Sequence, residues 1–271
     1  MTKWLARRAF LISALLSTII TSAMANNAPP DVVKELAPHG KLRAAINFGN
    51  TVLAQKDPAT GEPRGVSAEL ARELAKRLGV PVEFVTFDAA GKVFEALKQG
   101  AWDIAFLAID PLRAEGIDFT PPYVIIEGTY LVPANSALRT IADVDREGVR
   151  VAVGRGSAYD LFLTRALKQA KLVREPSGNE ALAMFMRDKL EAAAGVKQPI
   201  VAFAKEHPDT RVIEGRFMVI DQAMGTPKGR PAGLRYLKQY IEEMKASGFV
   251  ANALKASGQL DASVAPPAPV Q

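Results

Sequence analysis

The feature that most constrains the fold is an alternation of strand and helix patterns in the first half of the chain. The continuous apolar run Ile104–Ile109 has the length of a strand and lacks a polar position, as expected for a strand covered on both faces. Val82–Phe87 alternates as a strand, and apolar residues spaced four apart across 66–78 form one face of a helix. With a short apolar strand at 42–46 and a second helix ending at Gly100, the order predicts an α/β fold with a mostly parallel sheet.

The same pattern restarts after a break at 133–136, which predicts a second α/β unit. Alternating valines at 149–153 predict a strand, and a helix is expected from about Ser157 to Ala170. Further elements are expected as follows: a helix at 179–189, an apolar run at 190–196, strands at 212–213 and 217–220, and helices through 234–244 and 249–254. The proline-rich segment 261–271 lacks a core-forming pattern and is expected to be a disordered tail.

The N-terminus has the pattern of an export signal. Basic residues at positions 3, 7 and 8 precede the apolar stretch Ala9–Ile20, and Ala23-Met24-Ala25 is a small-x-small cleavage pattern. A signal peptide over 1–25 therefore predicts a periplasmic protein. The stretch around Arg7-Arg8 also fits the twin-arginine route, and ordinary secretory export fits equally well.

Composition excludes several classes of site. The chain of 271 residues has no cysteine and two histidines, which leaves little for a thiolate metal site, a cysteine nucleophile or a standard serine triad. Removal of 1–25 takes away three of the 34 Lys and Arg and none of the 29 Asp and Glu, so the net charge falls to 31 − 29 = +2. With aromatic residues at 7%, this balance does not favour nucleic-acid binding. Neither a cofactor nor a metal is expected.

Four motifs in order resemble the periplasmic solute-binding proteins of amino-acid-type ABC importers, family 3. The motifs are Gly65-Val66-Ser67-Ala68-Glu69-Leu70, Leu97-Lys98-Gln99-Gly100-Ala101-Trp102-Asp103, Arg113 with Ile117–Tyr123, and Val149–Ser157. The resemblance covers roughly residues 40–258. It implies two α/β lobes that close on a ligand, with lobe one at 40–131 plus 225–260 and lobe two at 133–223.

The resemblance implies that Arg113 grips the carboxylate of the ligand. A guanidinium presents paired donors that match a carboxylate, which suits that role. Asp110 and Pro111 also favour a helix start at this place, with Asp110 as its N-cap, and the two readings are compatible.

The turn Gly154-Arg155-Gly156-Ser157 is expected to complete the carboxylate site from the second lobe. Free backbone N–H groups at a helix start, together with the Ser157 hydroxyl, would receive an anion. The alternative is a tight turn capped by Ser157 with no ligand role. Arg155 is expected either to reach the cleft or to point to solvent.

The chain also departs from the family pattern. The stretch between Asp103 and Arg113 is about two residues short and has no hydroxyl side chain, and no acid stands near Gly195-Val196-Lys197, where relatives that bind α-amino acids hold the ammonium. Glu127 or Asp221 could substitute, and a carboxylate ligand without an α-ammonium fits the surviving groups better. Phe48 and Phe87 are candidate aromatic walls of the ligand site, and packing in the core is the alternative for each.

Three functions follow from these expectations. The first is a soluble, monomeric receptor that binds a small carboxylate-bearing solute (an amino acid or a related organic acid) and presents it to an ABC permease in the inner membrane. The second is an enzyme on the same scaffold, a dehydratase of cyclic carboxylates, for which Glu127 or Glu191 would have to act as acid or base. The third is a periplasmic sensor that reports to a separate partner.

Overall fold

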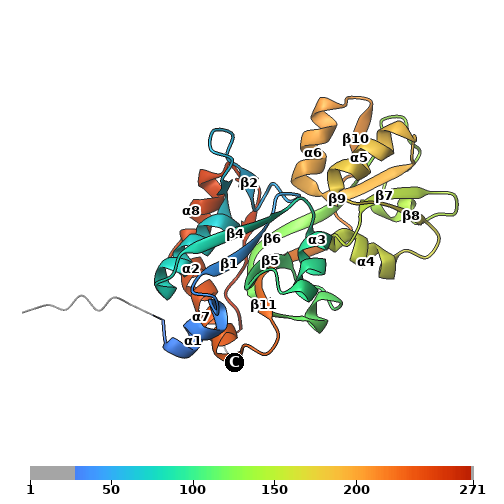
Figure 1. Ribbon diagram of the computed structural model, residues 1–271. Helices are drawn as coiled ribbons and strands as arrows, with labels where there is room; N and C mark the ends of the chain where they lie inside the picture. Colours follow the sequence, from blue (N-terminus) through green and yellow to red (C-terminus); the bar gives the residue numbers. More distant parts are fainter. Residues whose placement is uncertain (1–27, 270–271) are drawn as a thin grey trace, which may run out of the picture.

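The computed structural model describes residues 28–269 and shows two lobes that share one sheet (Figure 1). The expected signal peptide at 1–25 lies outside the described residues. The main sheet has ten strands: β1 (Leu42–Asn47), β4 (Val82–Phe87), β5 (Ile104–Ala108), β6 (Ile117–Pro133), β7 (Arg150–Gly154), β8 (Lys171–Glu175), β9 (Ala192–Val196), β10 (Thr210–Val212), β11 (Met218–Pro227) and β12 (Ser263–Val264). β2 (Gln55–Lys56) and β3 (Pro63–Arg64) form a separate hairpin.

Eight α-helices cover this sheet within the described residues. They are α1 (Pro30–Leu36), α2 (Val66–Leu78), α3 (Ala90–Ala96), α4 (Ala158–Ala166), α5 (Gly178–Arg187), α6 (Lys197–Glu206), α7 (Pro231–Ala246) and α8 (Phe249–Ala256). Among residues 28–269, none of the helices combines the length and the apolar character that a membrane crossing requires.

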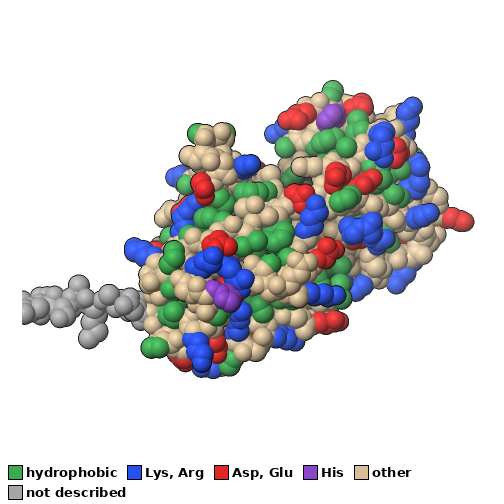
Figure 2. All heavy atoms as spheres, viewed as in Figure 1, with side chains coloured by type: hydrophobic (Ala, Val, Ile, Leu, Met, Phe, Trp, Pro, Cys, Tyr) green, Lys and Arg blue, Asp and Glu red, His purple; other side chains and the backbone are tan. Residues whose placement is uncertain are grey.

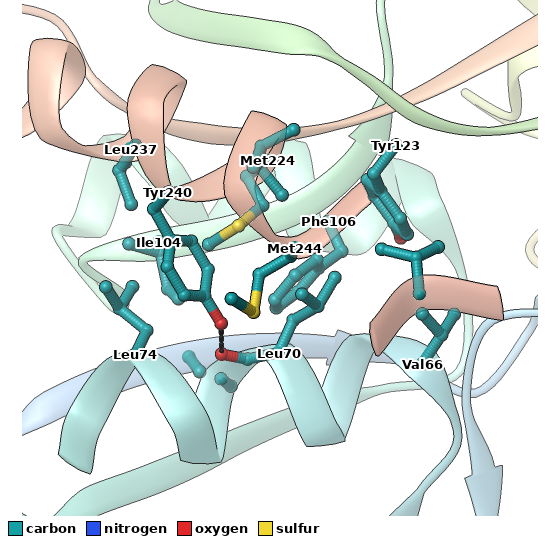
Figure 3. Packing of buried hydrophobic residues seen from close by; sticks show 14 of the residues in the cluster. Val66, Leu70, Leu74, Ile104, Phe106, Tyr123, Met224, Leu237, Tyr240 and Met244 are labelled. Atoms are coloured by element: carbon teal, nitrogen blue, oxygen red, sulfur yellow. Dashed lines mark hydrogen bonds between the residues drawn. The ribbon is translucent and has the colours of Figure 1, made fainter. Parts of the chain in front are cut away.

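The first lobe is built on the parallel strands β4-β1-β5, paired in register from Leu42 against Val82 to Asn47 against Phe87. Alternate residues of β5 face opposite sides: Ile104 and Phe106 pack with α2, α7 and α8, whereas Leu107 packs with α3. Burial on both faces explains why 104–108 is apolar throughout. In the larger core the Tyr240 hydroxyl donates a hydrogen bond to the Leu70 carbonyl oxygen at 2.7 Å (Figure 3).

The second lobe repeats this arrangement with the parallel strands β9-β7-β8. Val151 and Val153 pack on the face that holds α4, and Ala152 packs on the opposite face with α5 and α6. The period of two therefore places apolar residues on both faces of this part of the sheet, and helices cover both. The expected α/β class is confirmed. The expectation of a mostly parallel sheet holds only for β4-β1-β5 and β9-β7-β8, because the pairings made by β6 and the pairing of β11 with β5 are antiparallel, so the sheet as a whole is mixed.

Two long antiparallel strands connect the lobes. β6 pairs with β11 from Gly128 against Met218 to Ile117 against Pro227, and its far end pairs with β9 and β10. Near Pro121 and Pro122 the pairing is irregular, and the Thr120 hydroxyl accepts a hydrogen bond from the Met224 N–H at 3.2 Å. Figure 1 shows β6 running from one lobe into the other.

The helix expected at 157–170 is shorter in the structure, and a strand follows it. The carboxylate of Asp145 accepts hydrogen bonds from the N–H groups of Lys168, Gln169 and Ala170, which ends the helical pattern. β8 then pairs in parallel with β7. The helix expected through Ala170 thus ends at Ala166, and the strand at 171–175 was not expected.

The expectation of a disordered tail is corrected for residues 261–269. β12 pairs with β6, and the Ala265 N–H donates to the Tyr123 carbonyl oxygen at 3.1 Å. The Lys245 ammonium donates to the Pro266 carbonyl oxygen at 2.8 Å. Proline-rich sequence can follow a sheet edge, because an edge strand needs only some of its N–H groups paired.

Candidate functional site

A cavity of about 50 Å³ lies between the lobes, at the carboxyl ends of the parallel strands. In open α/β sheets, ligands usually bind at the carboxyl ends of the strands, where the following helices begin. The first lobe contributes Asn47, Gly49, Asn50, Asp88–Ala90, Phe106–Ala108 and Arg113; the second contributes Gly154, Arg155, Ser157–Tyr159, Ser177 and Gly178; Val196, Ile220 and Gln222 complete the lining.

Arg113 is the main charged group of this cavity, and it is 1% exposed. Its Nη1 donates to the Ala108 carbonyl oxygen at 2.9 Å, and its Nη2 donates to the Gly156 carbonyl oxygen at 2.8 Å, in the opposite lobe. Its Nε has no hydrogen-bond partner among the described residues. Burial lowers the pKa of Arg113 to about 10, so the guanidinium is still charged at neutral pH. The site therefore holds a buried cation bonded only to neutral carbonyl groups.

The acids around Arg113 are all engaged with other partners. Asp110 accepts from Arg165 at 2.7 Å and from the Leu112 N–H at 2.9 Å. Asp160 accepts from Arg174 at 2.8 Å, and Asp88, at the cavity wall, pairs with Lys92 at 2.7 Å. None of these carboxylates is bonded to the Arg113 guanidinium.

The N–H groups of the turn 154–157 are not free, which corrects the sequence-based expectation. The Gly156 N–H donates to the Asp160 carboxylate at 2.8 Å, the Arg155 N–H to the Glu175 carbonyl oxygen at 2.7 Å, and the Ser157 N–H to the Gly154 carbonyl oxygen at 3.1 Å. The Ser157 hydroxyl accepts from the Asp160 N–H at 3.0 Å and so acts as the N-cap of α4. Gly156 instead contributes its carbonyl oxygen to Arg113.

The first turn of α4 offers other amide groups. Ala158 and Tyr159 line the cavity at positions where a helix has no preceding carbonyl to bond its N–H groups. Neither of these two N–H groups has a hydrogen-bond partner among residues 28–269. Arg155 also lines the cavity, and its side chain is exposed and makes no hydrogen bond with the described residues. The second lobe thus contributes a positive helix end and a free guanidinium.

Phe48, Phe87 and Glu127 do not belong to this cavity. Phe48 packs partly buried on the core that contains α2, and Phe87 packs on the core that contains α3. Glu127 lies on β6 beside a separate groove, where it forms ion pairs with Lys197 and Arg216. The hydrogen bond from Lys197, and to a smaller extent the one from Arg216, lowers the pKa of Glu127.

Two further acids named from the sequence also lie elsewhere. Glu191 accepts hydrogen bonds from the Arg150 backbone and guanidinium at 2.8–2.9 Å, and the Arg150 guanidinium lowers its pKa. Asp221 is exposed on β11 and does not line the cavity. An ionised acid held by a guanidinium outside the cavity is poorly placed for general acid–base chemistry on a bound solute.

Two polar side chains that the sequence analysis did not name line the cavity. Asn50 follows β1 and is 8% exposed, and its Oδ1 has no partner among the described residues. Gln222 on β11 is 5% exposed, and its amide makes no hydrogen bond in the described part of the chain. In the sequence, Asn50 is a polar residue in a turn, and nothing else distinguishes it. Gln222 could be recognised as a site residue only from the pairing of β11 with β5, which places it opposite Ala108.

The lobes touch closely around the cavity. Gly91 at the start of α3 faces the turn before α4, and a Cβ atom at Gly91 would lie 2.5 Å from the Arg155 carbonyl oxygen. The Asp110–Arg165 ion pair joins the loop after β5 to α4. The lobes are therefore in contact at Gly91, at the Asp110–Arg165 ion pair and at Arg113.

Within residues 28–269, no three His, Asp or Glu side chains gather as a metal site would require. On the face drawn in Figure 2, Lys and Arg side chains are interspersed with Asp and Glu over both lobes.

Comparisons with known proteins agree with this architecture. A model of the bacterial extracellular solute-binding proteins, family 3, matches residues 53–256. The glutamine-binding protein of Geobacillus stearothermophilus is 21% identical over 206 residues, which are 74% of this chain and 78% of that protein. The structure of the solute receptor for L-cysteine of Neisseria gonorrhoeae superposes with a TM-score of 0.72 at 25% identity, covering 84% of this chain and 92% of that chain.

An ancestral amino acid-binding protein, described as a precursor of cyclohexadienyl dehydratase, has a TM-score of 0.69 at 26% identity and covers 83% of this chain and 98% of that chain. The family match spans most of the described elements, from the loop after β1 to the end of α8. The fold expected from the motifs is thereby confirmed. The chain belongs to the bacterial extracellular solute-binding proteins, family 3.

Proposed function

We propose that this protein is the periplasmic substrate-binding component of an ABC importer, which captures a small carboxylate-bearing solute by closure of its two lobes. The observation that carries the proposal is the buried Arg113 guanidinium, which bonds to carbonyl groups of both lobes and to no acid. A buried cation without an anion costs several kcal/mol, and a ligand carboxylate would offset that cost.

The ligand carboxylate would lie between Arg113 and the first turn of α4. Arg113 offers its unpartnered Nε, and the helix end offers N–H groups at Ala158 and Tyr159. Contacts to both lobes at once make the ligand favour the closed arrangement, which is the coupling that a receptor for a permease needs. We further propose the lobe bounds 40–131 plus 225–260 and 133–223, and a monomer that meets the permease in the inner membrane.

The test is a thermal-shift screen against amino acids, keto acids, hydroxy acids, dicarboxylates and aromatic acids. A ligand at 100 times its Kd should add about 2.7 kcal/mol to the free energy of unfolding. Arg113→Ala should abolish the shift, while Arg146→Ala, on an exposed ion pair of the second lobe, should retain it. If no carboxylate stabilises the protein, the proposal is wrong. Loss of uptake of the hit compound in cells lacking the gene would support the importer role.

An enzymatic role is the second candidate, because one similar structure is described as a precursor of a dehydratase. An enzyme would need an acid or base in the cavity, but Glu127 and Glu191 lie outside it. Asp88 lies at the cavity wall and is already paired with Lys92. Unchanged recovery of the hit compound after prolonged incubation with the protein would favour the receptor. Conversion to a product would favour the enzyme.

A further inference from the structure

The cavity has a charge balance that constrains the ligand beyond the presence of a carboxylate. One ligand carboxylate neutralises Arg113, and the acids within reach are already paired with Arg165, Arg174 and Lys92. An additional ligand ammonium would leave one buried positive charge in excess. A second cation, Arg155, at the same wall adds to that excess.

The neutral polar groups of the cavity indicate what accompanies the carboxylate. The Asn50 Oδ1 is a buried acceptor without a donor among residues 28–269, and such an atom is costly unless a ligand supplies one. Gln222, also buried, adds an amide that can donate and accept. A hydroxyl group can donate to an acceptor such as the Asn50 Oδ1, can accept from an amide such as that of Gln222, and carries no charge.

We infer that this site selects a small hydroxylated carboxylate over the corresponding amino acid, and that the Asn50 Oδ1 accepts a hydrogen bond from the ligand hydroxyl. The inference rests on the proposed function and names its substrate class. The cavity of about 50 Å³ favours ligands of a few carbon atoms. The Asn50 side chain is free for this role, because the Asn50 backbone rather than its side chain holds the turn: its carbonyl oxygen accepts from the Leu53 and Ala54 N–H groups at 3.1 Å.

The test is calorimetric titration with matched triplets of hydroxy, amino and unsubstituted carboxylates of two to six carbons. Lactate, alanine and propionate form one triplet, and glycolate, glycine and acetate form another, so that every member carries a single carboxylate. At least one hydroxy acid should bind at least tenfold more tightly than both of its counterparts. If an amino acid binds as tightly as its hydroxy counterpart or more so, this inference is wrong while the proposed function stands. If no member of any triplet binds, this inference is wrong, and the proposed function fails with it only if the wider thermal-shift screen also finds no carboxylate that binds.

Two substitutions of Asn50 sharpen the test. Asn50→Leu should remove the preference for the hydroxy acid over the unsubstituted acid. Asn50→Asp supplies the missing negative charge and should shift the ratio of amino-acid to hydroxy-acid affinity by at least tenfold toward the amino acid. Asn135→Asp, at an exposed turn outside the cavity, is the matched control and should leave the ratio unchanged. Unchanged ligand ratios in both Asn50 variants, with normal thermal unfolding, would overturn the role of Asn50.

Discussion

The Arg113 guanidinium donates a hydrogen bond to the Gly156 carbonyl oxygen, 2.8 Å away in the other lobe. The side chain therefore contributes to contact between the lobes as well as offering its remaining donor to the cavity. An arginine in this position bonds to carbonyl groups through its Nη atoms and keeps its Nε free for a ligand, which requires a planar group with several donors. A lysine can carry the charge, but it cannot reach two carbonyl groups and a carboxylate with the same geometry.

Arg113→Lys should therefore weaken carboxylate binding even though the charge is kept. The loss of one charge-assisted hydrogen bond is worth roughly 1.5–3 kcal/mol, or about tenfold to more than a hundredfold in Kd. Titration of the tightest carboxylate from the screen measures the effect. Arg155→Lys, at the exposed cavity wall, is the comparison and should change Kd by less than about threefold, since exposed charges contribute little. Equal losses in the two variants would contradict the central role of Arg113.

Gly91→Ala should hinder lobe closure without destabilising the fold. A Cβ atom at this position would lie 2.5 Å from the Arg155 carbonyl oxygen, a backbone atom that cannot move away alone. Overpacking of this kind costs roughly 1–3 kcal/mol, so affinity should fall by about tenfold. In the unliganded protein, alanine within α3 should raise the free energy of unfolding by up to about 1 kcal/mol, because glycine disfavours helix.

X-ray scattering with and without the carboxylate measures closure in this variant. The wild type should become more compact on binding, and Gly91→Ala should do so less or only at higher ligand concentration. Glu95→Ala, at an exposed position of the same helix, is the control and should close normally. Normal compaction of Gly91→Ala at wild-type affinity would show that the lobes do not meet at this contact.

Arg165→Ala should weaken binding modestly and in a salt-dependent manner. Arg165 pairs with Asp110 across the lobes at 2.7 Å, and its side chain is 48% exposed, so the pair is worth up to about 1 kcal/mol at low salt. Kd should rise by up to about fivefold at low salt, and the difference should shrink at high salt because of screening. Arg146→Ala, which removes an exposed pair within the second lobe, should leave Kd unchanged at every salt concentration. A salt-independent loss in Arg165→Ala would exclude an electrostatic role for the pair.

The buried strands and the cleft arginine could be predicted from the sequence, because their physical causes are local. The apolar run at 104–108 follows from burial on both faces of β5, and the helix at 66–78 follows from one apolar stripe; Ile109, at the end of the run, is exposed. Arg113 was conspicuous as a cation in the segment that carries the family resemblance. Each of these inferences depended on a pattern within a few residues.

The remaining features depend on contacts between distant segments. β6 was not predicted as one strand of 17 residues, because prolines at 121 and 122 usually interrupt a strand; here the Thr120 hydroxyl supports the irregular pairing. Phe87 was expected in the cleft because a sequence does not say which face of a strand meets the ligand. Asn50 became a candidate only when its burial and its unpartnered oxygen were known.

Two acids at corresponding places in the lobes provide a stability test: Asp103 pairs with Arg43 and Arg230, and Glu191 pairs with Arg150. Arg43 binds Asp103 just before β5 as Arg150 binds Glu191 just before β9, in each case through the backbone N–H and the guanidinium. Asp103 is 0% exposed, whereas the Glu191 side chain is 36% exposed. Breaking a buried pair costs roughly 3–5 kcal/mol because the partner charge is left unpaired, and an exposed pair contributes at most about 1 kcal/mol.

Asp103→Asn should therefore lower the free energy of unfolding by about 3 kcal/mol or more at pH 7, and Glu191→Gln by at most about 1 kcal/mol. The Arg150 guanidinium lowers the pKa of Glu191 in the folded protein, so the stabilisation by this pair is complete above the ordinary pKa of a glutamate and is lost as the pH falls through the lowered value. The small difference between wild type and Glu191→Gln should accordingly vanish in acid. Urea denaturation of both variants from pH 7 to pH 3 measures these quantities. A cost at Glu191 that equals the cost at Asp103 at pH 7 would show that exposure does not set the strength of these pairs.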